Sequence, residues 1–475
     1  MSKRLILILA LAFVVGVSAA AFAEVQNVKV SGDITVLGIM RELGLNNGEG
    51  VGVVDVVSDK EQDMVTITRV RIDADLTDNV MTTVRLINER YWGTEAENSG
   101  NDDNSNINLD LAYVTLKEFL YSPLTVTVGR QELRFGNAMI IGDPDTNGAV
   151  VTTSPLAWAT TTGVGNNNLI ESSNSDLSAR KAFDAIRLNL NYDPLVVDIV
   201  AAKIQENFRT IDDDVSLYGI NANYRLGDIL GGRLKNTVVE GYYWCRHIGG
   251  ERYALPNKTD RIDLIGSRLV TSPMENLIFQ VESAMQFGKA RNEITGVLLH
   301  PTPQRKAWAA ETALTYNMPK VKYTPSVTAM YAFFSGDNNK NRKNRKYYKA
   351  WDPMFEDQKF GDIANAQFAQ TNSHVVGLVG SMKPKEDITL QGEAYFFWWD
   401  KIFMDDEVLT TLRGNSVVMK HNKWAGSEID LKAIYDYTED VQFSLLYGNF
   451  IPGSSFDEKT SNIAQELIGS MKVTF

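Results

Sequence analysis

The sequence is poor in the residues that build catalytic, metal and redox sites. It has one cysteine, Cys245, and only four histidines, which are far apart: His247, His300, His374 and His421. A single cysteine excludes a disulfide within the chain. Neither H-E-x-x-H nor G-x-S-x-G occurs, so the usual zinc-protease and hydrolase signatures are missing. We therefore predict no enzyme, no cofactor and no metal. A hydrolase whose site is assembled from distant segments is kept as the third functional hypothesis, after the two given below.

Positive charge and long apolar runs are also scarce. The chain has 47 Lys and Arg against 59 Asp and Glu, a formal charge of −12. Nucleic-acid binders usually carry a basic face, so nucleic acid is not an expected partner. After residue 23, no apolar run approaches the ~20 residues of a membrane-spanning helix. If the chain crosses a membrane, it must do so as a closed barrel, because lipid cannot satisfy open backbone groups.

The first 23 residues have the organisation of an export signal. Lys3 and Arg4 precede an apolar stretch over residues 5–20, and Ala21-Phe22-Ala23 matches a signal-peptidase cleavage pattern. We predict a cleaved signal peptide at residues 1–23. Residues 24–475 then form the folded domain, in which no composition shift or linker marks a second one.

Short runs of alternating apolar and polar residues recur along this domain. Between residues 69 and 76, apolar side chains alternate with Arg69, Arg71, Asp73 and Asp75. A strand sends successive side chains to opposite faces, so one face is apolar and the other charged. The pattern returns at residues 80–86, 107–113, 186–192, 279–286 and 428–435. In the second of these runs, it places Leu111 and Tyr113 on the apolar face.

Turn signals separate these runs into an alternating series of eight short and nine long connections. Proline and Asx residues mark the short ones, such as Ser122-Pro123, Asp193-Pro194 and Ser272-Pro273. Transmembrane barrels have short periplasmic turns, long outer loops and aromatic girdles, and aromatic residues gather here at strand ends. Seventeen connections join eighteen strands, with sixteen as the alternative. We predict an all-β transmembrane antiparallel barrel in the outer membrane of a Gram-negative-type envelope.

The chain ends on an alternating strand with a terminal aromatic residue. Met471, Val473 and Phe475 share the apolar parity. Outer-membrane barrels present such an ending to their assembly machinery. We therefore predict two macromolecular partners, the lipid bilayer and the barrel-assembly machinery, the latter through the strand that ends in Phe475.

Several segments resemble the alginate export family of outer-membrane channels. They are residues 129–133 (G-R-Q-E-L) followed by Phe135-Gly136, residues 183–187 (F-D-A-I-R), residues 335–337 (S-G-D), residues 426–431 (G-S-E-I-D-L) and residues 447–453. Their order and span cover most of the domain. The resemblance implies an eighteen-stranded monomeric barrel with charged residues lining a constricted pore.

The charged parity supplies candidate pore-lining residues. Rings of charged side chains select ions, and arginine suits carboxylates through bidentate contacts. We predict the lining set to include Arg69, Arg71, Arg85, Arg130, Arg134, Arg187, Asp73, Asp75, Asp110 and Glu132. The alternative is that the arginines pair with neighbouring aspartates and brace the wall. Mixed charge leaves two cargo hypotheses open. Passive passage of anionic saccharides or oligosaccharides, or of other small hydrophilic solutes, is the leading one, and a general porin for small nutrients and ions is the second.

In the run at residues 124–135, a strict alternation of faces conflicts with the charge of the last side chains. Continued strictly, it points Arg130, Glu132 and Arg134 into lipid, which is costly for ionisable groups. A bulge at Gly129 would turn these three residues inward, and glycine readily adopts the positive φ of a bulge. We predict that bulge. The competing possibility is that the strand leaves the bilayer before Arg130.

Two loop segments have weaker signals for ion binding. Residues 143–148 (D-P-D-T-N-G) match the first half of a calcium loop, but Ser154 stands where a bidentate glutamate is expected. A polar loop with Asx turns is the favoured interpretation. Residues 340–349 are strongly basic and fall in an outer loop. They could collect anions at the channel mouth, but a solvated loop is favoured.

Overall fold

The computed structural model describes residues 27–45, 60–93, 107–145, 176–206, 214–249, 260–290, 303–337, 346–405, 407–412, 416–458 and 461–475. The predicted signal peptide lies outside these residues, so its cleavage stays a prediction. Among the described residues, no helix is long and apolar enough to cross a membrane. The chain is built instead from long antiparallel strands.

Eighteen strands form one closed antiparallel barrel, as the connection count predicts. They are β1 (Asn27–Glu42), β2 (Lys60–Thr77), β3 (Val80–Tyr91), β4 (Asn108–Leu116), β5 (Leu124–Glu132), β6 (Ala182–Asn191), β7 (Leu195–Gln205), β8 (Val215–Ile229), β9 (Leu234–Ile248), β10 (Asp260–Met274), β11 (Leu277–Lys289), β12 (Gln304–Asn317), β13 (Ser326–Phe334), β15 (Ser373–Lys385), β16 (Ile388–Trp399), β19 (Trp424–Asp436), β20 (Val441–Pro452) and β21 (Ala464–Thr474).

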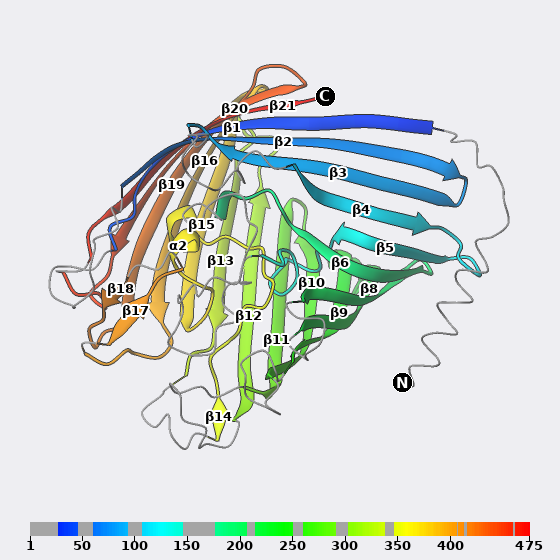
Figure 1. The fold of residues 1–475 in the computed structure, drawn as a ribbon. Helices are drawn as coiled ribbons and strands as arrows, with labels where there is room; N and C mark the ends of the chain where they lie inside the picture. The colour runs from blue at the N-terminus through cyan, green and yellow to red at the C-terminus, as the bar shows by residue number, and fades with distance from the viewer. Residues whose placement is uncertain are drawn as a thin grey trace.

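Where the long connections are described, they contain three short strands and one short α-helix. β14 (Tyr347–Tyr348) pairs parallel to β12, and β17 (Val408–Thr410) pairs with β18 (Ser416–Val418). The helix α2 (Asp362–Gln367) belongs to the connection between β13 and β15. Figure 1 shows the barrel strands side by side in a continuous curved wall, with α2 in front of β15 and β19.

The first and last strands close the barrel. β1 pairs with β21 from Asp33↔Thr474 to Glu42↔Gln465. Beyond this ladder, Gly32 and Phe475 exchange backbone hydrogen bonds of 2.8 and 3.0 Å. A Cβ on Gly32 would lie 2.7 Å from the Phe475 ring, so glycine leaves the space that the terminal aromatic occupies. The last residue is therefore part of the seam.

The two faces of the wall follow the predicted alternation. Ile186, Met285 and Ile429 are about half exposed on the outer face, whereas Glu282 and Asp430 are buried on the inner face. Aromatic side chains cluster at both ends of the strands, as at Tyr435, Tyr437 and Phe443 or Trp398 and Trp424. This is the apolar outer band with two aromatic girdles that a membrane barrel needs.

Strand β5 contradicts the predicted bulge at Gly129. It pairs without a register shift on both sides, with Gly129 opposite Tyr113 and Ala185, and Arg130 opposite Ala112 and Asp184. Gly129 does have a positive φ of 123°, and a Cβ there would lie 2.1 Å from the Ala112 carbonyl oxygen. Glycine is thus required by the close approach of β4, and the bulge prediction is wrong.

The irregularity lies one strand away, in β4. There Arg85 opposes Leu111 while Leu86 opposes Leu109, so Asp110 is the extra residue. A bulge shifts the alternation beyond it, which turns both Asp110 and Leu111 inward. Tyr113 lies opposite Thr83 on that same inner face. The prediction that Leu111 and Tyr113 face outward is therefore wrong.

One short turn also differs from its prediction. Ser272-Pro273 lies within β10, where the register shifts between Thr271 and Met274. The chain reverses at residues 275–276 instead. Proline has no backbone N–H to donate, so it is tolerated at such an irregularity but does not itself have to make the turn.

Candidate functional site: a charged lumen with inward-folded segments

Two loop segments fold into the barrel and pack against its inner wall. We call residues 133–145, after β5, the first inner segment, and residues 350–371, before β15, the second inner segment. Leu133 and Phe135 of the first, and Trp351 and Phe355 of the second, are buried in one apolar cluster with inward residues of β6–β16. The resulting apolar core lies inside the barrel and narrows its lumen.

Backbone hydrogen bonds join the two inner segments to each other. The amides of Phe355 and Asp357 donate to the carbonyl oxygens of Ile140 and Ala138 at 3.0 and 2.9 Å, and the Gly142 amide donates to Phe355 at 2.7 Å. The Phe183 ring packs edge-on against Phe355 at 6.0 Å. The segments therefore form one unit on the wall.

A row of four charged residues on the wall holds the first inner segment. The strand register places Glu240, Arg268, Glu282 and Glu311 side by side across β9–β12. Glu240 and Glu282 accept the backbone N–H groups of Gly136 and Asn137 at 3.2 and 3.0 Å. The Asn137 side chain bridges Arg268 and Glu311 at 2.8 and 2.5 Å. The excess of carboxylates is thus used to bind N–H donors.

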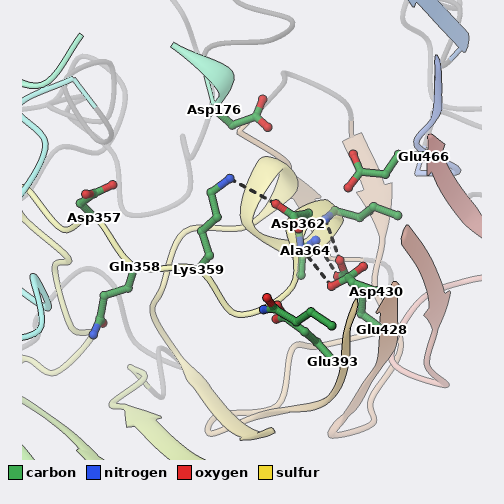
Figure 2. A network of polar contacts seen from close by, with 12 residues as sticks. Asp176, Asp357, Gln358, Lys359, Asp362, Ala364, Glu393, Glu428, Asp430 and Glu466 are labelled. Carbon is green, nitrogen blue, oxygen red and sulfur yellow. Dashed lines mark hydrogen bonds and ion pairs between the residues drawn. The ribbon is translucent and has the colours of Figure 1, made fainter. Parts of the chain in front are cut away.

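A second row holds helix α2. Glu393, Asp430, Gly448, Glu466 and Arg41 are neighbours across β16, β19, β20, β21 and β1. Beside this row, Glu428 accepts the backbone N–H groups of Ile363 and Ala364 at 2.7 and 2.8 Å, as Figure 2 shows. Figure 2 also shows Asp176 and Lys359 on the side of the helix opposite Glu428.

A buried four-charge cluster anchors the start of the second inner segment. Arg246 of β9 forms a bidentate contact with Asp352 at 2.9 and 2.6 Å, and Arg305 of β12 contacts Asp260 at 2.8 Å. Burial raises the pKa of the Asp352 carboxyl, but Arg246 and Arg305 outweigh it and hold this pKa below its usual range. Asp352 is therefore charged at neutral pH.

A third group of charges joins the two segments near the start of β6. Lys181 pairs with Asp357 and, at 3.3 Å, with Asp143, while Arg134 also pairs with Asp357. Burial opposes ionisation of Asp357, but Lys181 and Arg134 lower its pKa. The neighbouring Glu356 has no salt-bridge partner among the described residues, and burial raises its pKa to about 8.

Most predicted arginines lie on the inner face, but each has a carboxylate partner. Arg69 pairs with Asp33 at 2.9 Å, Arg71 with Asp73 at 2.7 Å, and Arg187 with Asp198 at 2.7 Å. Arg85 pairs with Asp110 at 2.5 Å and also with Glu132. Asp75 lies on the same face, opposite Asn27 at the start of β1. Their positions are as predicted, while their role in selectivity stays a prediction.

Arg130 is the exception among the predicted lining arginines, and Glu132 shares its strand parity although its carboxylate pairs with Arg85. The register partner of Arg130 is Asp184, which shares its parity with the outward Ile186, so both charges lie on the outer face. They form a salt bridge of 3.1 Å. Pairing reduces the cost of an outward charge, so no bulge is needed to turn it inward. Arg134, which follows the strand, contacts the second inner segment instead.

The calcium hypothesis gains no support from the part of the chain that is described. One Asp143 oxygen accepts the Asp145 backbone N–H at 2.8 Å, an Asx turn, and the other faces Lys181 at 3.3 Å. No group of three or more potential metal ligands occurs among the described residues. Residues 146–154 and most of the basic loop at residues 340–349 lie outside them.

Sequence reasoning missed the anchoring residues, such as Glu240, Glu311, Arg246 and Arg305. Alternation does place them inside the barrel, but their partners are residues of loops. The predicted lining set also left out two further cations: parity with Asp430 and Glu466 puts Lys432 and Lys472 on the inner face. Neither lysine has a carboxylate partner among the described residues. Strand parity alone could have found both.

A closed eighteen-strand barrel with a charged, loop-narrowed lumen defines an outer-membrane channel. The family model for alginate export matches residues 57–470, and the chain belongs to that family. No curated protein matches the sequence.

Three solved structures share this fold at low sequence identity. OccAB1 of Acinetobacter baumannii is 11% identical, with a TM-score of 0.53 over 97% of this chain and 99% of that one. OccK2 (OpdF) of Pseudomonas aeruginosa, solved in complex with glucuronate, is 10% identical, with a TM-score of 0.50 over 95% and 99%. OpdQ of the same organism is 12% identical, with a TM-score of 0.51 over 95% and 99%.

Proposed function

We propose that this channel passes small anionic saccharides, with uronates as the representative cargo. The observation that carries the proposal is the state of the lumen arginines. The side chains of Arg71 and Arg187 are 36% and 34% exposed although both are paired. A paired guanidinium keeps further N–H donors, which can bind a carboxylate or a sugar hydroxyl.

Weak binding of this kind suits conduction. A solute must bind well enough to enter the channel and weakly enough to leave it. Asp73 and Asp198 compete with a passing carboxylate for the same arginines, which limits how tightly the cargo is held. Asp73, whose side chain is 29% exposed, can also accept a hydrogen bond from a sugar hydroxyl. The complex of a similarly folded channel with glucuronate supports the choice of a uronate as the test solute.

The experiment compares glucuronate with glucose in proteoliposomes that contain the purified channel. We expect glucuronate to enter faster, and the triple variant Arg71→Gln, Arg85→Gln, Arg187→Gln to lower the glucuronate-to-glucose ratio about fivefold, about 1 kcal/mol. Arg233→Gln, in the turn between β8 and β9, is the matched control. An unchanged ratio in the triple variant would mean that these arginines only brace the wall.

A general nutrient porin is the second candidate, and one observation favours it. Because Arg69, Arg71, Arg85 and Arg187 all have carboxylate partners, their ion pairs add little net positive charge to the lumen. Equal entry of glucose and glucuronate into liposomes with the unmodified channel would favour this candidate. The hydrolase alternative has no observation in its support among the described residues.

We also propose that the assembly machinery recognises strand β21 with its terminal Phe475. The residue is 60% exposed and lies beside the β1–β21 seam, which joins the first strand to the last. Deleting Phe475 should reduce the amount of heat-stable barrel in the outer membrane. The isolated protein should still refold in detergent, because the ten-residue ladder of the seam remains.

A further inference from the structure

A continuous row of aromatic side chains lies on the outer face of the barrel and crosses β13, β15, β16 and β19. It stands at the end of these strands from which the long loops leave. Register pairs join Phe333 to His374, His374 to Trp398 and Trp398 to Trp424. Ring centroids are 4.8 Å apart for Phe333 and His374 and 5.0 Å for Trp398 and Trp424. These rings stand at the level of the membrane interface.

Two lysines lie just beyond this row, on the side away from the membrane. Lys401 follows β16 and Lys423 precedes β19, and both act electrostatically on His374. Asp400 pairs with Lys401 at 2.8 Å. Lys423 is exposed and has no carboxylate partner among the described residues. One aspartate therefore balances only part of the positive charge.

Apolar side chains continue below the row towards the middle of the barrel. Val376, Phe396, Leu378 and Ile429 are 41%, 41%, 53% and 52% exposed on the outer face. They occupy the next two outward register rows across β15, β16 and β19. From rim to midplane, this strip therefore presents cations, then a row of aromatic rings, then apolar side chains.

We propose that this strip binds an anionic lipid of the outer leaflet through its phosphorylated headgroup. We call residues 374, 398, 401, 423 and 424 the rim site. Lys401 and Lys423 contact the phosphate, while Trp398 and Trp424 pack on the headgroup sugar or glycerol. The acyl chains lie on the apolar side chains below. A free anion would use the lysines alone, whereas a lipid uses all three layers, so the observations favour the lipid.

The opposite end of the same strand offers a matched control. Lys383 and Lys385 lie at the periplasmic end of β15, two exposed lysines on the strand that carries His374. Replacing them removes the same two positive charges as replacing Lys401 and Lys423. They lie a full strand length from the rim site. A general attraction of the barrel to anionic lipid would affect both pairs equally.

The experiment measures binding of bisphosphorylated lipid A to the purified full-length channel by native mass spectrometry and by the rise in thermal midpoint. We expect binding to the unmodified channel and to Lys383→Gln, Lys385→Gln. The double variant Lys401→Gln, Lys423→Gln should bind about tenfold to thirtyfold more weakly, from about 1 kcal/mol for each lysine. Both pairs are exposed, and heat-modified gel mobility verifies that each variant folds.

Three results would overturn the proposal. Equal binding by the two double variants would show that the rim site is not special. Undiminished binding of dephosphorylated lipid A would remove the role of the phosphate. Equal thermal protection by inorganic phosphate at the same concentration would make the rim a site for small anions. None of these outcomes depends on which solute passes through the lumen.

Discussion

The inner wall of the barrel uses charge in two different ways. Across β9–β12, charged side chains are buried against loop segments; the side chains of Arg246 and Arg305 are each only 6% exposed. Across β2 and β3, the Arg71–Asp73 pair remains about one-third exposed to the lumen. The comparison teaches that an inward charge in this barrel does not identify a solute contact. Its burial decides whether it anchors a loop or faces the pathway.

The largest expected effect comes from breaking the buried cluster with Asp352→Asn. Removing one partner from a buried ion pair costs about 3–5 kcal/mol, because Arg246 and Arg305 lose a charge that balances them. The second inner segment should detach, which raises single-channel conductance and exposes residues 350–371 to protease. The control Asp73→Asn breaks an exposed pair and should cost about 1 kcal/mol or less. Similar losses of stability in both variants would contradict the comparison.

An intermediate effect is expected from pH, through Glu356. Its pKa is raised from 4.5 to about 8, so the folded protein holds a proton that the unfolded chain releases. The stabilising contribution is full below pH 4.5 and is lost as pH rises through 8. The thermal midpoint in detergent should therefore fall between pH 5 and pH 9, and Glu356→Gln should flatten that fall. The exposed Glu439→Gln should keep it; a Glu356→Gln curve parallel to the unmodified protein would refute the assignment.

The smallest effect is expected from two lysines of the lumen, through the ion selectivity of the channel. Lys432→Gln with Lys472→Gln removes two cations that have no carboxylate partner in the described part of the chain, so the reversal potential in a salt gradient should shift away from anion preference. The shift should shrink at high ionic strength because salt screens exposed charges. The charge-neutral pair Arg71→Gln with Asp73→Asn should leave the reversal potential almost unchanged. A larger shift from this second variant would mean that the ion pairs set the selectivity.

The face of the wall on which a side chain lies could be predicted from the sequence, because strand parity is a local property. The outward positions of Ile186 and Ile429 and the inward position of Arg187 follow from alternation alone. Parity fails where a single extra residue enters a strand, as at Asp110, because every side chain beyond it changes face. Gly129 was a plausible place for that residue, yet its glycine serves the contact with Ala112.

The sequence by itself determined the class of protein: alternating strands, short turns against long loops, and a terminal aromatic residue are all local patterns. Only the tertiary structure decided which inward charges meet solute. Asp352 reaches Arg246 across 106 residues of chain, and Asn137 reaches Glu311 across 174. No local pattern encodes such contacts, because they depend on two loops folding into a lumen whose width is set by barrel closure. The physical reason is burial: a charge removed from water must find a partner, and that partner lies wherever the closed barrel brings it.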